Sequence, residues 1–191
     1  MDIEVNNRKV KIKNDQLDLS NLEIADLTEV EGLEDLKNLK SLNLFNNNLS
    51  SIRNLSSLVK LEKLNLYGNK IEVIIGLERL ENLRTLYLSN NKITKIQGLE
   101  KLKRLETLSF EDNRIKKIEG LDNLENLVHL NLYGNLISKI EGFESLHKLK
   151  QLRIGNNPIA CETIEKLGGI KTNGYVFTPQ NFVKFCQILI K

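Results

Sequence analysis

Few residues of the chain are of the types that carry catalytic chemistry, and their spacing does not assemble a reactive site. The two histidines, His129 and His147, lie 18 residues apart. Neither Cys161 nor Cys186 has a histidine nearby in the sequence, as an activated thiol requires. Glu111 has only the adjacent aspartate beside it, and adjacent side chains point in different directions. Since no glycine-rich phosphate loop is present either, the sequence predicts a protein that is not an enzyme and has no metal or cofactor site.

Binding is the chemistry that the remaining side chains do support. Tyrosine and arginine are enriched at binding hot spots because they bury much area and keep a polar group. The chain has only four tyrosines and six phenylalanines, with no tryptophan. Four of these aromatic residues fall in a sequence repeat of 22 residues, at positions that we expect to be exposed. With their polar neighbours they form the candidate contact surface: Phe45, Asn65, Tyr67, Tyr87, Glu111, His129, Asn131, Tyr133 and Arg153.

A second interpretation of these aromatic residues is purely structural. Aromatic side chains favour strands and stack along neighbouring strands, which lie about 4.8 Å apart. Phe45, Tyr67 and Tyr133 share one position of the repeat, but Ser89 and Glu111 occupy that position in the units between. A continuous stacking ladder is therefore interrupted, which favours a contact surface centred on the tyrosines.

The elements that position these residues follow a fixed period. An asparagine recurs every 22 residues without a slip, at Asn47, Asn69, Asn91, Asn113, Asn135 and Asn157. The apolar frame around each asparagine is also constant, as in Leu58, Leu61, Leu64, Leu66, Ile71, Ile74 and Leu77. Such a period indicates supersecondary units that can bury their apolar face only against their neighbours.

Each unit contains one short alternating segment, such as Leu42-x-Leu44. A period of two is typical of a strand with one buried and one open face. Stacked copies would form a parallel sheet of about seven strands, with the residues beside each buried pair on the open side. The return segment is too short for a long helix and favours turns of 3₁₀ structure on the outer wall.

Two recurring residues are explained by the backbone. Glycine occupies one position in five units, at Gly32, Gly76, Gly98, Gly120 and Gly142. This predicts positive φ or close approach of the chain, and Asn54, which replaces the glycine in one unit, tolerates positive φ best among other residues. We interpret the six recurring asparagines as structural, because a buried backbone group left unpaired costs about 1–3 kcal/mol.

The two ends are predicted to cap the stack, which divides the chain into 1–16, 17–159 and 160–191. Ile3-x-Val5, Asn6-Asn7-Arg8 and Val10-x-Ile12 predict a small hairpin. After the last asparagine we expect helical turns over 161–167, a final strand over 175–177 and a helix starting at Thr178-Pro179. The apolar stripe of that helix predicts a lid over the last repeat, or, if the stripe were exposed, an interaction or lipid-facing helix.

The composition limits which partners and which cellular compartment we expect for the protein. Charged residues make up 28% of the chain and the net charge is +3, which argues against a strongly basic nucleic-acid surface. The polar segment 1–13 does not resemble a signal peptide, and no apolar run approaches the length of a membrane span. Because two cysteines are too few for the disulfide caps of secreted solenoids, we expect a reducing compartment, the cytoplasm.

The frame resembles a known family. The segment NKITKIQGLEKL, Asn91 to Leu102, is similar to the 22-residue leucine-rich repeats of the regulatory subunit of protein phosphatase 1 and of its intracellular relatives. The similarity extends over 27–159. It implies an α/β fold: a right-handed leucine-rich repeat solenoid with a parallel concave sheet, turns or 3₁₀ structure on the convex side, and terminal caps. It also implies a non-catalytic scaffold that grips a protein partner, a helix or a phosphatase-like or GTPase-like globular protein. We expect the chain to be a monomer.

Two alternatives from other classes stay open. Basic residues recur after the asparagines, at Lys70, Lys92, Lys95, Arg114, Lys117 and Lys139, and acidic residues follow the glycine position, at Glu34, Glu78, Glu100, Asp122 and Glu144. Such stripes are typical of a solvated face, but the basic edge could bind RNA or phosphate, with strong dependence on salt. The chain could also assemble with itself through an uncovered strand or the terminal helix.

Overall fold

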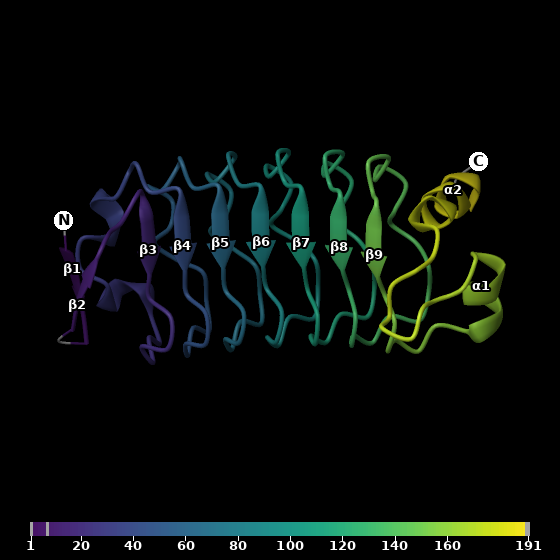
Figure 1. Cartoon of the computed structure of the whole chain (residues 1–191), viewed down its shortest axis with the longest axis horizontal. Coiled ribbons are helices and arrows are strands. Elements are labelled where there is room, and N and C mark those ends of the chain that lie inside the picture. Colours follow the sequence, from purple (N-terminus) through teal and green to yellow (C-terminus); the bar gives the residue numbers. More distant parts are fainter. Residues whose placement is uncertain (1, 7, 190–191) are drawn as a thin grey trace.

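The computed structural model describes residues 2–6 and 8–189 and shows a solenoid of stacked coils (Figure 1). Seven short strands form one parallel sheet in sequence order. They are β3 (Gln16–Asp18), β4 (Ser41–Asn43), β5 (Lys63–Asn65), β6 (Thr85–Tyr87), β7 (Thr107–Ser109), β8 (His129–Asn131) and β9 (Gln151–Arg153). The predicted parallel sheet of about seven strands is confirmed, and its register pairs the same repeat position in every coil, as in Leu42 with Leu64.

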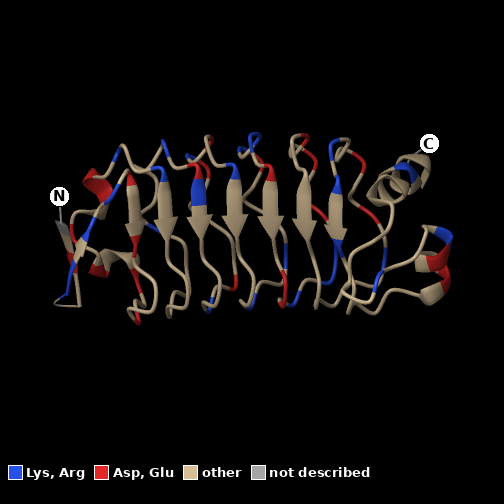
Figure 2. Ribbon diagram, in the orientation of Figure 1, with Lys and Arg blue, Asp and Glu red and all other residues tan. Residues whose placement is uncertain are grey.

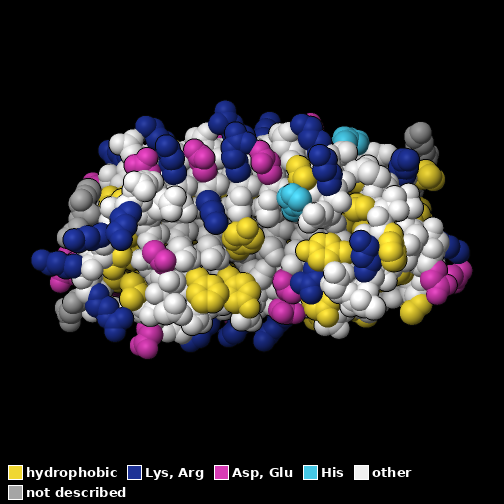
Figure 3. Space-filling model, in the orientation of Figure 1, with side chains coloured by type: hydrophobic (Ala, Val, Ile, Leu, Met, Phe, Trp, Pro, Cys, Tyr) yellow, Lys and Arg dark blue, Asp and Glu magenta, His cyan; other side chains and the backbone are white. Residues whose placement is uncertain are grey.

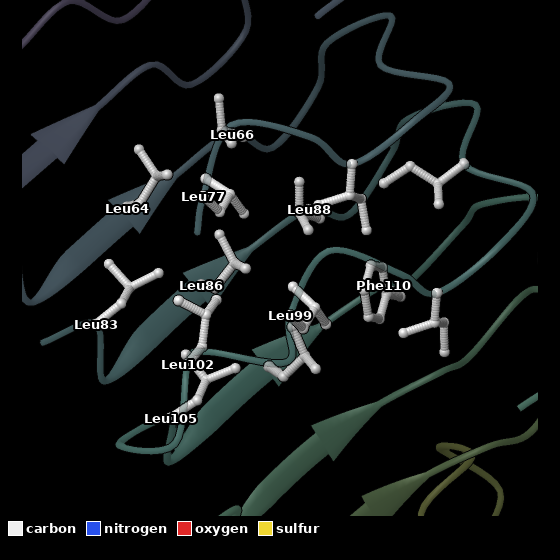
Figure 4. Packing of buried hydrophobic residues seen from close by; sticks show 14 of the residues in the cluster. Leu64, Leu66, Leu77, Leu83, Leu86, Leu88, Leu99, Leu102, Leu105 and Phe110 are labelled. Atoms are coloured by element: carbon white, nitrogen blue, oxygen red, sulfur yellow. The ribbon is translucent and has the colours of Figure 1, made fainter. Parts of the chain in front are cut away.

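The recurring leucines fill a single continuous core. Figure 4 shows leucines of successive coils packed against one another, with Phe110 in place of one leucine. Leu64, Leu86 and Phe110 are all 0% exposed. Each coil buries its apolar residues only against the coils beside it, so that stability is shared along the stack.

The return side of the coils consists mainly of turns. Two 3₁₀ helices, η1 (Leu27–Glu29) and η2 (Leu33–Asp35), lie in the first, irregular coil. Later coils instead make repeated i to i+3 hydrogen bonds, as from Leu80 N–H to the Leu77 carbonyl and from Leu83 N–H to the Leu80 carbonyl, both 2.9 Å. The expected mixture of 3₁₀ structure and turns is confirmed, and within residues 2–6 and 8–189 the regular 3₁₀ segments lie only in the N-terminal coil.

The asparagine ladder has the structural role predicted for it. Asn91 Oδ1 accepts the N–H of Ile71 on the preceding coil at 3.0 Å. Its Nδ2 donates to the carbonyls of Leu66 and Leu88, at 2.9 and 3.1 Å. The other five asparagines make equivalent bonds. Each amide therefore joins two coils through backbone groups that would otherwise be buried unpaired.

The recurring glycines have both of the predicted features, positive φ and a close approach to a neighbouring part of the chain. All five have φ between 69° and 88°, and Asn54 has φ 62°. A Cβ at Gly98 would lie 2.7 Å from the carbonyl oxygen of Ile74 on the preceding coil. The acidic residue two positions later caps this turn, since Glu100 Oε1 accepts the Gly98 N–H at 3.2 Å. Part of the acidic stripe thus supports the backbone and is more than a solvated face.

A second series of positive-φ positions was missed from the sequence. The residue before each recurring asparagine has φ between 52° and 70°, at Asn46, Gly68, Asn90, Asp112, Gly134 and Asn156. The signal was present, because asparagine, aspartate and glycine are the residues that tolerate this conformation. Asp112 is therefore a turn residue, which explains its position beside Glu111 without any acid–base role.

The N-terminal cap contains the predicted hairpin. Strands β1 (Asp2–Val5) and β2 (Arg8–Lys11) pair in antiparallel register, with Ile3 opposite Val10. Asn7, part of the expected turn, lies outside the described residues. The hairpin lies beside β3 at the start of the sheet (Figure 1).

The C-terminal cap follows the prediction except for one strand. Helices α1 (Cys161–Lys166) and α2 (Pro179–Leu189) are present. The expected strand over 175–177 is wrong: Tyr175 and Val176 form only isolated bridges, to Arg153 and Ile170. Two different partners and the positive φ of Gly174, 83°, prevent a regular ladder there.

Helix α2 is a lid over the last coil. Phe182, Val183 and Cys186 are buried, and the Phe182 ring meets the edge of Phe143 with centroids 6.3 Å apart. The N-terminal part of the apolar stripe is therefore covered, whereas Leu189 is exposed. Over residues 2–6 and 8–189, no helix is both long and apolar enough to cross a membrane.

Candidate functional site

Large side chains gather on the face of the sheet that carries the residues beside the buried leucines. Figure 3 shows hydrophobic side chains there in two groups, one over the middle strands and one nearer the C-terminal cap. The structure places the nine predicted contact residues on this concave face, but in two different environments.

The first group is the Phe45–Tyr67 pair, together with Tyr87. The rings of Phe45 and Tyr67 are stacked, with centroids 5.2 Å apart and an interplanar angle of 18°. Both side chains remain open to solvent, with 37% and 38% of their surface exposed. The Lys63 ammonium lies 5.9 Å from the centre of the Tyr87 ring. A rigid sheet thus presents aromatic surface that no other part of the described chain covers fully.

Strand amides hold this group in place. Asn65 Oδ1 accepts the backbone N–H of Tyr67 at 3.1 Å, and its Nδ2 donates to Asn43 Oδ1 at 2.9 Å. Asn43 in turn accepts the N–H of Phe45 at 3.2 Å. Asn65 was predicted as a contact residue, and the structure shows that it also fixes the backbone beneath the aromatic pair.

The second group is the Arg153 cluster, formed by Arg153, Tyr133, Glu111, Asn131 and Tyr175. Arg153 forms an ion pair with Glu111, which is 42 positions earlier in the sequence. The guanidinium lies 4.1 Å from the centre of the Tyr133 ring and 5.8 Å from that of Tyr175. Asn131 Nδ2 completes the network with a 2.9 Å bond to Glu111 Oε2. Four predicted residues therefore come together, but they mainly satisfy one another.

Tyr133 is also enclosed by the C-terminal cap. A Cβ at Gly174 would lie 2.5 and 2.7 Å from two ring atoms of Tyr133. Arg153 Nε reaches the same loop and donates to the carbonyl of Asn173 at 2.8 Å. The sequence suggested that Tyr133 lies on an open surface; instead its ring is partly covered, because the loop over 173–175 folds back across the edge of β9.

Between the two groups lies a hollow of about 320 Å³, lined in part by Tyr87, Ser109, His129 and Tyr175. Ser109 and Ser89 are buried in its neighbourhood and share a hydrogen bond of 2.7 Å. Both serines were expected on the open face. They are covered because their short side chains lie among larger ones on the adjacent strands. Tyr175 was missed as a site residue, since its place on the concave face depends on the fold of the cap.

The residues considered for catalysis do not assemble. His129 is on β8, whereas His147 lies near α2, where Gln187 Nε2 is 3.3 Å from its Nδ1. Cys161 is exposed and Cys186 is buried, and burial raises the pKa of the Cys186 thiol to about 11. In the part of the chain that the structure describes, no three histidine, cysteine, aspartate or glutamate side chains are grouped to hold a metal ion.

The basic edge proposed for RNA or phosphate is partly neutralised. Lys95 and Lys117 both lie close to Glu119, at 3.7 and 3.9 Å. The sheet edge expected for self-assembly is also occupied at one end, because Val176 N–H donates to the Leu152 carbonyl at 2.9 Å. The C-terminal cap thus closes the side of β9 where a further strand would add.

Comparisons with known proteins agree with this architecture. The family model described as leucine-rich repeats, two copies, matches residues 37–78, 81–123 and 125–169, which is more than half of the chain. No curated protein matches the chain in sequence. The finer resemblance to the phosphatase regulatory subunit is not shown by these comparisons and stays a prediction.

Several solved structures are also similar to most of this chain. An internalin, inlF, of Listeria monocytogenes is 27% identical with a TM-score of 0.62, over 81% of this chain and 52% of its own. A leucine-rich repeat protein of Leptospira interrogans is 30% identical with a TM-score of 0.64, over 76% of this chain and 38% of its own. TLR13, solved in complex with ssRNA13, is 30% identical with a TM-score of 0.70, over 77% of this chain and 22% of its own. The chain thus spans about half of the internalin and less of the other two.

Proposed function

Because the chain belongs to the leucine-rich repeat family, we propose that it is a non-catalytic scaffold whose concave sheet binds a protein partner. Proteins of this family generally mediate protein–protein interaction. The observation that carries the proposal is the exposed Phe45–Tyr67 pair, held on a rigid sheet. Exposed aromatic side chains whose backbone is already ordered lose little entropy on binding, which favours affinity.

The proposed contact surface keeps all nine predicted residues, with different roles. Phe45, Tyr67 and Tyr87 supply the apolar contact, and Asn65 and His129 lie beside them as polar contacts. The Arg153 cluster forms a rigid shoulder that a partner would touch without rearranging it. A standard interface buries about 1,200–2,000 Å² in total, about half of it on each partner, and the seven strands of the sheet can supply this chain's half.

The test compares two matched variants as bait for affinity capture from the native cell. Phe45→Ala with Tyr67→Ala removes the open pair, and Val73→Ala with Ile75→Ala removes two exposed apolar side chains from the return side of a coil. We expect the first variant to capture a specific protein at least about tenfold less well, as for hot-spot residues, while the second behaves as the wild type. Equal capture by all three would refute the concave assignment.

The RNA-binding alternative has one observation in its favour, the similarity to the fold of TLR13, which was solved with RNA. Filter binding with single-stranded RNA at low and high salt would decide it: retention at low salt that is lost on Lys70→Glu with Lys92→Glu supports it, and no retention removes it. The cytoplasmic location and the monomeric state stay predictions. Light scattering over a range of concentrations checks the second.

A further inference from the structure

The N-terminal end of the concave face contains a hollow that is lined mainly by basic and polar side chains. It encloses about 630 Å³ between the hairpin and strands β3, β4 and β5. Its lining includes Lys11 and Lys13 from the hairpin side and Lys63 from β5, which face the hollow from two sides. Figure 2 shows basic residues along β2 and at β5, whereas β3, which lies between them, has acidic residues at its two ends.

The three lysines are available to a ligand. All three are exposed, and the ion pairs among the described residues do not include them. The one acidic residue in the lining, Asp18, is already engaged, since its Oδ1 accepts Asn43 Nδ2 at 2.9 Å and Ser20 N–H at 3.0 Å. The hollow therefore has an excess of positive charge facing its centre.

Neutral donors complement this charge. Asn43 and Asn65 both line the hollow. Asn43 Nδ2 donates one amide hydrogen to Asp18, and Asn65 Nδ2 donates one to Asn43. A primary amide has two hydrogens, so each retains one donor for a ligand. Ammonium groups and amide N–H donors together suit carboxylate oxygens, which accept several hydrogen bonds at once.

The hollow continues into the open aromatic pair. Phe45 and Tyr67 lie two positions beyond Asn43 and Asn65, the last residues of β4 and β5, a distance of about 6–7 Å along an extended chain. An occupant with carboxylates over the lysines could therefore place an apolar side chain on the two rings. Lys63 lies four positions before Tyr67, about 13 Å along an extended chain, so that a short peptide segment of about four residues spans the lysines and the rings.

The same features disfavour a nucleic acid. The Phe45 and Tyr67 rings are stacked on each other at 5.2 Å between centroids, which leaves no gap for a base between them. A net charge of +3 is also small for the binding of a nucleic-acid backbone.

We propose that this N-terminal end of the concave face binds an acidic segment of a protein partner, with its carboxylates over Lys11, Lys13 and Lys63 and an apolar side chain on the Phe45–Tyr67 pair. The inference rests on the proposed scaffold function and specifies the chemistry of its ligand. The lysines accelerate association and select for acidic sequences, while the aromatic pair supplies the apolar contact.

The test selects ligands from a displayed library of random dodecapeptides, with the full chain as target. We expect the selected peptides to be enriched in aspartate and glutamate beside one aromatic or large aliphatic residue. Binding of a fluorescein-labelled selected peptide, followed by anisotropy, should weaken as salt is raised.

Two triple variants that change the net charge by the same amount distinguish binding in the hollow from nonspecific electrostatic attraction. Lys11→Glu, Lys13→Glu and Lys63→Glu should lower the affinity at least about tenfold, because like charges then face the peptide. Lys70→Glu, Lys92→Glu and Arg114→Glu, on the other edge, should change it less than about twofold at moderate salt, since screening removes distant charges. A thermal melt confirms that each variant is folded.

The outcomes distinguish this inference from the proposed function. Selected peptides without acidic enrichment, or equal weakening by both triple variants, would overturn the inference. If those peptides still lose binding on Phe45→Ala with Tyr67→Ala, the scaffold function stands. If neither substitution set changes binding, both proposals fall. Tighter binding of labelled poly(U) or inorganic polyphosphate than of any acidic peptide, dependent on the three hollow lysines, would replace the proposed ligand class.

Discussion

The two aromatic groups of the concave face contain similar residues in opposite surroundings. Phe45 and Tyr67 stack on each other and stay open to solvent. Tyr133 is held by the Arg153 guanidinium and by the loop that contains Gly174. The comparison shows that position in the repeat does not by itself make an aromatic residue a binding residue, because neighbouring coils and the cap decide whether its surface remains free.

Because of this difference, we expect one group to contribute to folding stability and the other to contribute to binding. A side chain whose contacts are already made inside the molecule contributes to folding, and its removal costs stability. A side chain that is ordered but uncovered can contribute the same apolar contact to a partner. We therefore expect substitutions in the Arg153 cluster to act on unfolding, and substitutions in the Phe45–Tyr67 pair to act on binding.

In the comparison of the two aromatic groups, the largest effect on stability is expected at Gly174, which lies against Tyr133. Gly174→Ala places a Cβ against the ring at positive φ, and should lower the free energy of unfolding by about 3 kcal/mol. Gly68, which follows Tyr67, has φ 70° but would bring its Cβ no closer than 3.5 Å to any neighbour. Gly68→Ala should cost only about 1 kcal/mol. Urea unfolding measures both, and equal costs would contradict the crowding at Tyr133.

The same variant should open the cap around α2. Burial raises the pKa of the Cys186 thiol to about 11, so that little thiolate forms near neutral pH, whereas Cys161 is exposed. We expect a thiol reagent at pH 8 to label Cys161 quickly and Cys186 only through local opening. Gly174→Ala should accelerate Cys186 labelling, and Gly68→Ala should leave it unchanged. Rapid labelling of both cysteines in the wild type would show that the lid is not closed.

A smaller difference is expected between the two tyrosines themselves. Tyr133→Ala removes a ring packed against the cap and should cost about 2 kcal/mol of unfolding free energy. Tyr67→Ala removes a half-open ring and should cost less than about 1 kcal/mol. Denaturant titration of both variants, with Phe45→Ala as a second open-ring control, gives the ranking. A larger cost at Tyr67 would reverse the assignment of the two groups.

The smallest effect concerns the ion pair. Glu111 and Arg153 are 27% and 22% exposed, so a double-mutant cycle with Glu111→Gln and Arg153→Met should give a coupling of about 1 kcal/mol. The Arg84–Glu106 pair is about half exposed on both sides and should give a coupling close to zero. Equal couplings would mean that partial burial does not strengthen the Arg153 cluster.

Much of the fold could be predicted from the sequence because the period is strict. Asn91 and Gly98 recur at fixed positions, and each has one backbone requirement that few other residues meet. The caps are not repeated, so that only local signals were available there. Pro179 indicated the start of α2 correctly, but Tyr175 was assigned to a strand because an apolar run does not reveal that its partners are two separate segments.

The candidate site was less predictable for the same reason. Repeat position correctly placed Tyr67 and Tyr133 on one face, but it could not show that Glu111 reaches across a coil to Arg153. Lys11 and Lys13 were assigned only to the cap, and their approach to Lys63 depends on how the hairpin lies against β3. Contacts between a cap and a repeat have no counterpart in the periodic pattern.

The most direct test of the open surface is site-specific photo-crosslinking in the native cell. A benzophenone amino acid replaces Tyr67 in one variant and Val73, on the return side, in another. The account predicts a discrete covalent adduct with one partner protein at position 67 and none with that partner at position 73. No adduct at position 67, or the same adduct at both positions, would contradict the claim that the concave sheet is the binding surface.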